Sequence, residues 1–142
     1  MNISRVFLDA NIFIDSQDDS RSRYEESYKI VPYLLKNNIR IYTSCDLITT
    51  IYYILAKKDK KRALQSIEEL NKFCNIIEFS NKEVSQAVAL MKSDTKFGDL
   101  EDTLQYVLAK KLSCEMIISN DQAFHSPDVE LLSSTEFAKR FL

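Results

Sequence analysis

The sequence contains few of the residues that break regular structure or build covalent cross-links. One glycine, Gly98, and two prolines in 142 residues leave little material for tight turns, so long regular elements and a helix-rich fold are expected. Three widely spaced cysteines without a CxxC pair, and a single histidine to join them, disfavour a disulfide framework and a zinc site. No apolar run approaches the roughly 20 residues of a membrane helix. Because the N-terminus also lacks the plan of a signal peptide, we expect a cytoplasmic protein with no membrane partner.

The length and net charge of the chain indicate its number of domains and how it could bind nucleic acid. A chain with 45% hydrophobic residues can bury the core of one domain, residues 1–142. The formal net charge of -2 disfavours broad electrostatic capture of nucleic acid, which depends on lysine and arginine. RNA binding would need a local basic patch, and the candidate is KKDKKR at residues 57–62, with Lys57, Lys58, Lys60, Lys61 and Arg62. The same run could equally be a solvated turn.

Strand-like and helix-like segments alternate along the chain. Short apolar, β-branched runs predict strands at residues 5–9, 40–44, 75–79, 115–119 and 129–132. The first, RVFLD, has no polar alternation, which is typical of a strand buried on both faces. The intervening segments predict helices, including one helix over residues 24–37. This alternation predicts a single α/β domain, a three-layer sandwich whose central, mostly parallel sheet of four to five strands has helices on both faces.

Local signals predict where several helices begin. Two capping boxes pair Ser80 with Glu83 and Ser133 with Glu136. Residues 99–112 are the most amphipathic segment, with apolar residues on one side at Leu100, Leu104, Val107 and Leu108. That spacing is typical of a helix that buries one face.

Acidic residues follow the predicted strands at the edge where sites gather in open parallel sheets. Asp9 ends the first strand, and Asp121 follows the fourth. Asp99 and Asp102, three residues apart, are neighbours in the first turn of the helix after Gly98, whereas Glu101 points elsewhere. If this helix begins beside the two strand ends, four carboxylates converge, and they repel one another unless they are protonated or bridged by a cation. Hard oxygen ligands of this kind suit Mg²⁺ or Mn²⁺.

Such a site favours phosphodiester hydrolysis, because a divalent ion lowers the pKa of bound water and stabilises a leaving oxyanion. The sequence offers little for rival chemistries. It has one histidine, no glycine-rich phosphate loop and no nucleophile elbow.

Four segments, in order along nearly the whole chain, resemble the PIN-domain nucleases and, within them, the VapC-like toxins. LDANIFID (8–15) is similar to the family's opening LDTNxxxD strand, and TSCDLITTIYYIL (43–55) to its second strand and following helix. FGDLEDTLQYVLA (97–109) resembles its D-x-x-D-A-L-Q helix, and MIISNDQAF (116–124) its strand ending in T-x-D-x-x-F. Each motif is loose, but four in sequence are fairly specific.

The resemblance implies a metal-dependent endoribonuclease, the toxin of a type II toxin-antitoxin pair. Such proteins are often dimeric and often silenced by a small antitoxin protein, and they leave a 3′-hydroxyl and a 5′-phosphate. Asp9, Asp102 and Asp121 fall on family acidic positions, and Asp99 on an acid found in one branch. These four residues are therefore the expected catalytic and metal-binding set.

The chain departs from the family pattern at two positions. Many relatives carry a glutamate where this sequence has Thr50, and often an acid where it has Ala123. Asp46, one turn before Thr50, could compensate, or metal affinity could be weaker. Asn11 is a further auxiliary candidate, as an outer partner that orients Asp9.

Structural roles compete with these functional ones. Asp9 and Asp99 could serve only as helix caps, and Asp121 could only start a turn. The main alternative function is a catalytically degenerate PIN-fold module that binds RNA or protein without cleavage. A receiver-like domain is a weaker alternative, because such domains pair adjacent acids after the first strand, whereas here the strongest acidic pair opens a late helix.

Overall fold

The five apolar segments pair edge to edge in one parallel sheet. The computed structural model describes residues 2–142, with strands β1 (Arg5–Leu8), β2 (Arg40–Ser44), β3 (Asn75–Ile77), β4 (Met116–Ile118) and β5 (Glu130–Leu132). Their order is β3-β2-β1-β4-β5, every neighbouring pair is parallel, and Phe7 of the central strand lies opposite Tyr42 and Ile117. The predicted parallel sheet is confirmed, and its carboxyl-terminal ends share one edge.

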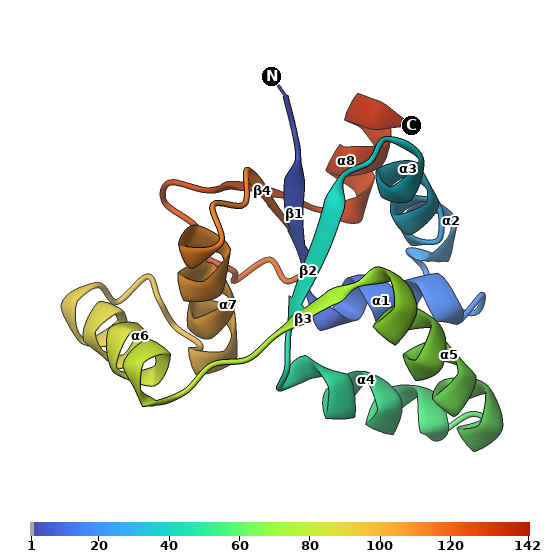
Figure 1. Cartoon of the computed structure of the whole chain (residues 1–142), viewed down its shortest axis with the longest axis horizontal. Helices are drawn as coiled ribbons and strands as arrows, with labels where there is room; N and C mark the ends of the chain where they lie inside the picture. Colours follow the sequence, from blue (N-terminus) through green and yellow to red (C-terminus); the bar gives the residue numbers. More distant parts are fainter. Residues whose placement is uncertain (1) are drawn as a thin grey trace.

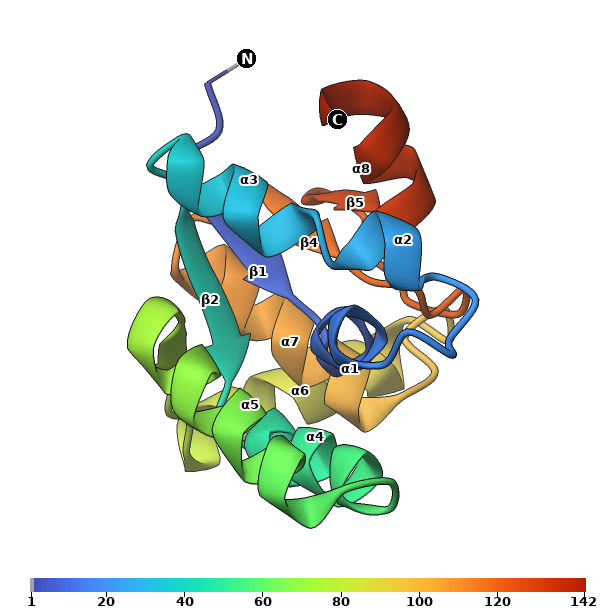
Figure 2. The same cartoon turned by 90° about the vertical axis from the view of Figure 1, so that its right-hand side faces the viewer.

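Helices cover both faces of this sheet. They are α1 (Ala10–Gln17), α2 (Tyr24–Ser27), α3 (Ile30–Lys36), α4 (Leu47–Ala56), α5 (Lys60–Phe73), α6 (Asn81–Ser93), α7 (Leu100–Lys111) and α8 (Ser134–Phe141). Figure 1 shows α6 and α7 on one side of the strands and α1, α3 and α8 on the other. Figure 2, turned by 90°, shows α3 in front of β1 and α7 behind it. The expected three-layer α/β arrangement is confirmed.

Alternating side chains of the strands build two separate cores. Val6 and Leu8 join a cluster that includes residues of α1, α3, α4 and α8. Phe7, between them, points to the opposite face and joins a cluster with Tyr106 and Leu108 of α7. Because successive side chains of a strand point to opposite faces, a strand buried on both sides needs an unbroken apolar run, which is what β1 has.

Helix α7 is more deeply buried than its sequence pattern indicates. Every residue from 102 to 109 is buried, whereas Leu100, expected on the apolar side, is 44% exposed. On its far side α7 also packs against α6 through Leu104, Val107 and Ala87. The prediction of one buried face is therefore wrong, because α7 is enclosed between the sheet and a second helix.

The helix predicted over residues 24–37 is also wrong, since the segment forms two helices, α2 and α3, with a break at residues 28 and 29. Pro32 lies in the first turn of α3. A proline has no N–H to donate and its ring clashes with the carbonyl four residues earlier, here that of Tyr28. The break places Pro32 where a helix tolerates it.

Both predicted capping boxes are confirmed. The Ser80 backbone N–H donates to Glu83 Oε1 over 2.9 Å, and that of Ser133 to Glu136 Oε1 over 3.0 Å. These helix starts are local features, which explains why the sequence predicts them well.

We expect Leu108→Ala to lower the free energy of unfolding by about 2–5 kcal/mol, because Leu108 is fully buried where α7 meets the sheet and truncation leaves a cavity. Leu64→Ala, at a helix position 64% exposed, is the matched control and should change stability by less than about 0.5 kcal/mol. Urea denaturation followed by circular dichroism measures both. Equal effects of the two substitutions would contradict the assigned packing of α7.

Candidate metal centre

Asp9 lies at the centre of the carboxyl-terminal edge of the sheet, directly after β1, and is only 4% exposed. Its Oδ1 accepts hydrogen bonds from the Ala10 backbone N–H at 2.7 Å and from Gln105 Nε2 at 3.0 Å. Its Oδ2 accepts one from Ser119 Oγ at 2.7 Å. Asp9 therefore caps α1, as one alternative anticipated, and also joins α1 to α7 and to the end of β4.

All three donors to Asp9 are electrically neutral. Burial raises the pKa of Asp9 above its ordinary value, although the bonds from Ser119, Gln105 and Ala10 act in the opposite direction, and the charge of Asp121 raises it further. Hydrogen bonds thus hold the carboxylate in place without supplying a positive charge to balance it.

Asp102, in the first turn of α7, is 7% exposed, and its buried Oδ2 has no hydrogen-bond partner among residues 2–142. Burial raises its pKa to about 8, and so do a hydrogen bond shared with the Asp121 carboxyl group and the charges of Asp121, Asp9 and Asp99. A buried, unpartnered oxygen among other acids is the position at which a cation would relieve the most repulsion.

Asp99 and Asp121 lie at the rim of this cluster, and each also has a local structural role. Asp99 Oδ2 accepts from the Asp102 backbone N–H at 3.0 Å, so Asp99 is the N-cap of α7. Asp121 Oδ1 accepts from the Ala123 backbone N–H at 2.9 Å, which closes a turn. Both nevertheless lie close enough to raise the pKa of Asp102. Capping and turn formation are thus compatible with the predicted convergence of four carboxylates.

Glu101 belongs to the same negatively charged region, although the helical spacing predicted that it points away from Asp99 and Asp102. Lost hydration raises its pKa, and so do the charges of four aspartates, Asp46, Asp9, Asp99 and Asp121. Asp46 precedes α4 and accepts a hydrogen bond from Ser44 Oγ. Thr50 lies half-buried one turn further along α4. Asp46, which follows β2, thus adds its negative charge to this region.

Two residues missed by the sequence analysis hold Asp9 in place. Gln105 is fully buried on α7, and Ser119 follows β4 and is 4% exposed. Ser119 Oγ also accepts from the Asp121 backbone N–H at 3.1 Å, so it connects two of the acids. One signal was available for Gln105, since it lies one helical turn after Asp102 on the same face.

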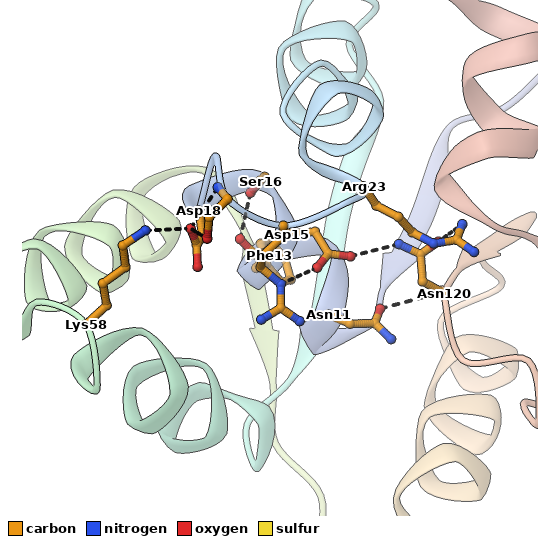
Figure 3. A network of polar contacts seen from close by, with 10 residues as sticks. Asn11, Phe13, Asp15, Ser16, Asp18, Arg23, Lys58 and Asn120 are labelled. Atoms are coloured by element: carbon orange, nitrogen blue, oxygen red, sulfur yellow. Dashed lines mark hydrogen bonds and ion pairs between the residues drawn. The ribbon is translucent and has the colours of Figure 1, made fainter.

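A polar network continues from the acids along α1 (Figure 3). Asn11 Oδ1 accepts from the Asn120 backbone N–H at 3.3 Å, and Asn120 Nδ2 donates to Asp15 Oδ2 at 3.0 Å. Asn11 contacts the loop that carries Asp121 and makes no side-chain hydrogen bond to Asp9 in the part of the chain that the structure describes. The hydrogen bond of Asn11 therefore reaches the neighbouring loop, and its auxiliary role stays a prediction.

The basic segment at residues 57–62 lies apart from the acids. It connects the end of α4 to the start of α5, so the ten residues of α4 separate it from Asp46, a rise of about 15 Å. Lys58 Nζ pairs with Asp18 Oδ1 at 2.9 Å beyond the end of α1 (Figure 3). Any contact of this segment with nucleic acid would be remote from the carboxylates.

The donor set fits a hard divalent cation that retains much of its water. No three His, Cys, Asp or Glu side chains within residues 2–142 are already spaced to hold a metal ion among themselves. Mg²⁺ is usually bound by only one or two carboxylates, with water and substrate phosphate completing its shell. The adjoining carboxyl groups of Asp102 and Asp121, with the unpartnered Asp102 Oδ2, meet that requirement.

Comparison with known proteins gives one extended sequence match and several structural ones. A family model described as PIN domain matches residues 5–123. The chain is 48% identical over 141 residues to Ribonuclease VapC1 of Aquifex aeolicus, and the alignment covers 99% of this chain and 98% of that protein.

Solved structures share the fold at low sequence identity. Mycobacterium tuberculosis VapC20, a sarcin-ricin loop cleaving toxin, aligns with a TM-score of 0.68 and 14% identity over 84% of this chain and 92% of its own. VapBC2 from Rickettsia felis, bound to a promoter DNA fragment, aligns with a TM-score of 0.70 and 20% identity over 91% of this chain and 98% of its own. At these identities the structural matches support the fold alone.

Burial of Asp102 and its repulsion by neighbouring acids predict that replacing its carboxyl group by a neutral amide stabilises the protein at high pH. Since the folded-state pKa of about 8 exceeds the ordinary 3.8, folding takes up a proton between these values. Burial of Asp102 therefore lowers the free energy of unfolding as pH rises from 4 to 8. In chelator, Asp102→Asn should raise the Tm at pH 8 by about 3–10 °C and change it little at pH 4.

Scanning calorimetry at both pH values measures this difference, with Glu68→Gln, at an exposed acid on α5, as the control that should change the Tm little at either pH. A lower Tm for Asp102→Asn at pH 8 would contradict the conclusion that the charged form of Asp102 destabilises the fold.

Proposed function

Since the chain belongs to the PIN-domain family, we propose that it is an endoribonuclease that hydrolyses RNA phosphodiester bonds with Mg²⁺ or Mn²⁺. The observation that carries the proposal is the buried pair of Asp9 and Asp102 at the sheet edge. Neutral donors hold Asp9, Asp102 keeps an unpartnered oxygen among residues 2–142, and further acids surround both. The near full-length relationship to a ribonuclease at 48% identity supports the same activity.

The roles proposed for the side chains follow from their positions. Asp102 and Asp121 would hold the ion, with Asp9 and Asp99 completing the negative field around it. When bound, such an ion supplies a water of lowered pKa and stabilises charge on the phosphoryl and leaving oxygens. Ser119 and Gln105 position Asp9 through their hydrogen bonds. The products would carry a 3′-hydroxyl and a 5′-phosphate.

The proposed biological role is that of a toxin controlled by a small antitoxin protein. The solved structures with the same fold include VapBC2 from Rickettsia felis and VapBC-1 from Haemophilus influenzae. A homodimer is also proposed, and exposed apolar side chains on α4 and α6, among them Tyr53, Val84 and Val88, are candidates for its interface. No helix formed by residues 2–142 has the length and apolar character to cross a bilayer, and we propose a cytoplasmic location.

The basic segment is proposed as an RNA contact outside the centre. Lys57, Arg21 and Arg62 border a hollow of about 790 Å³ between the end of α1 and the α4–α5 connection. Phosphate contacts of this kind set affinity and register without reading sequence.

Replacing either buried acid should abolish cleavage without unfolding the protein. We expect Asp9→Asn and Asp102→Asn to reduce the rate of RNA cleavage by at least about a hundredfold, because each removes charge at the proposed metal. The assay is digestion of total RNA with and without Mn²⁺, with the new ends identified by sequencing. Glu68→Gln, at an exposed acid on α5, should retain full activity. Full cleavage by both variants would remove the assignment.

Metal binding separates the nuclease from the alternative of a degenerate binding module, which Thr50 at the family's glutamate position makes worth testing. Mn²⁺ should raise the Tm of the protein progressively once its concentration exceeds the Kd, with about 2.7 kcal/mol of stabilisation at a hundred times the Kd. Asp121→Asn should weaken that response, and Glu68→Gln should not. A Tm of the unsubstituted protein that does not respond to Mn²⁺ would favour the binding module.

A further inference from the structure

A hollow next to the carboxylates has the opposite charge. Its volume is about 360 Å³, and its lining residues are Asn11, Asp15, Arg21, Ser22, Arg23 and Asn120. Asn120 immediately precedes Asp121, and Asn11 lies in the first turn after Asp9. Two arginines face one aspartate in this hollow, so it is locally positive in a protein with a net charge of -2.

The two arginines are held by specific bonds on either side of Asn120. Arg21 Nε pairs with Asp15 Oδ1 at 2.6 Å. Arg23 Nη1 donates to Asn120 Oδ1 and to Thr135 Oγ1, each at 3.2 Å. Figure 3 shows Arg23 reaching from the loop between α1 and α2 toward Asn120, with Asp15 and Asn11 on α1 below it. The guanidinium groups are thus oriented before any ligand arrives.

Arg21 retains free donors in this arrangement. A guanidinium has five N–H groups, and the pairing of Arg21 with Asp15 uses only its Nε. Neither terminal nitrogen of Arg21 bonds to another group within residues 2–142, and its side chain is 39% exposed. Two parallel N–H groups in a fixed plane match the oxygens of a phosphate.

Arg23 brings the positive charge that is not balanced. Its bonds go to neutral oxygens of Asn120 and Thr135, and within the described residues it forms no ion pair. Its link to a carboxylate is indirect, since Thr135 Oγ1 in turn donates to Glu26 Oε2 at 2.7 Å. A half-buried cation with neutral partners is stabilised by an incoming anion.

We propose that this hollow is a phosphate-binding subsite that receives a backbone phosphate of the RNA strand next to the one being cleaved, with Arg23 and Arg21 as its ligands. The inference rests on the proposed nuclease function, because that function places an RNA strand at Asp9 and Asp121. The bond from the Asn120 backbone to Asn11 joins the subsite to the acids, so a strand bound in one is aligned with the other.

The subsite also connects the centre to the basic segment. Arg21 borders both this hollow and the larger one, whose lining includes Lys57, Lys58 and Arg62 together with Asp18, Asp19 and Asp59. Lys58 pairs with Asp18, whereas Lys57 and Arg62 form no ion pair within residues 2–142. A path of cations with acids between them therefore runs from Arg23 past Arg21 to the α4–α5 connection. A single strand with one charge per nucleotide follows such a path by electrostatic attraction.

The test measures binding of a short, fluorescein-labelled single-stranded RNA to the Asp102→Asn protein, which should bind without cleaving. Arg23→Ala in this background should raise the Kd about tenfold or more, as expected for loss of charged hydrogen bonds. The slope of log Kd against log salt should fall by about 0.7, the value for one phosphate on a single strand. Arg40→Ala, an exposed arginine at the start of β2 on the opposite edge of the sheet, is the matched control and should leave the Kd unchanged.

A second arm identifies the phosphate. RNAs in which one phosphate at a time is replaced by neutral methylphosphonate should show one position that costs affinity with Arg23 present and costs nothing in Arg23→Ala. Arg23→Lys keeps the charge but not the planar fork, so it should retain the salt slope and lose part of the affinity. Thermal unfolding of each variant checks its fold. If Arg23→Ala does not fold, the methylphosphonate series is measured on Arg23→Lys in its place.

A Kd for Arg23→Ala equal to that of Arg40→Ala overturns the subsite. So does a loss of affinity in which every methylphosphonate penalty persists, because Arg23 would then act only on the structure of the loop. If the unsubstituted protein fails to cleave RNA while binding depends on Arg23, hydrolysis is overturned and the subsite stands. If the unsubstituted protein cleaves RNA but binding does not depend on Arg23, hydrolysis stands and the subsite is overturned.

Discussion

The structure depends on a group of carboxylates packed at one edge of the sheet and held in place by neutral donors. Asp9 is buried among an amide side chain, a hydroxyl and a backbone N–H, and Asp102 keeps an oxygen that has no partner among residues 2–142. Such an arrangement costs folding free energy, because charge is removed from water without an opposite charge beside it. A protein retains such a cost where the strained group has a function, and a divalent cation is the simplest species that relieves it.

The surrounding fold supplies the rigidity that this arrangement needs. Helix α7 carries Asp102 and is enclosed by the sheet on one side and α6 on the other. Gln105 on α7 and Ser119 after β4 both bond to Asp9, so three elements distant in sequence meet at one carboxylate. Repulsion among the acids therefore acts against a packed core, which limits how far they can separate.

The charge distribution around the centre is strongly polarised, although the net charge of -2 conceals it. The carboxylates of α7 and of the strand ends form a negative region that includes Glu101 and Asp46. Arg23 and Arg21 lie immediately beside it, in the hollow next to Asn120. Adjacent regions of opposite sign would suit the proposed substrate, an RNA strand with one phosphate at a metal centre and a neighbouring phosphate held by cations.

The sequence by itself determined the strands, most of the helices and their arrangement as a parallel sheet between two helix layers, because these features depend on local pattern. It also predicted the four aspartates as a candidate site, from the rule that parallel strands end at one edge. Only the tertiary structure decided that α7 is buried all round, that Gln105 and Ser119 hold Asp9, and that Glu101 joins the acids. Sequence spacing gives the face of a helix on which a side chain lies, but not what packs against that face. Contacts between elements about a hundred residues apart, such as Ser119 with Asp9, exist only once the sheet has brought them together.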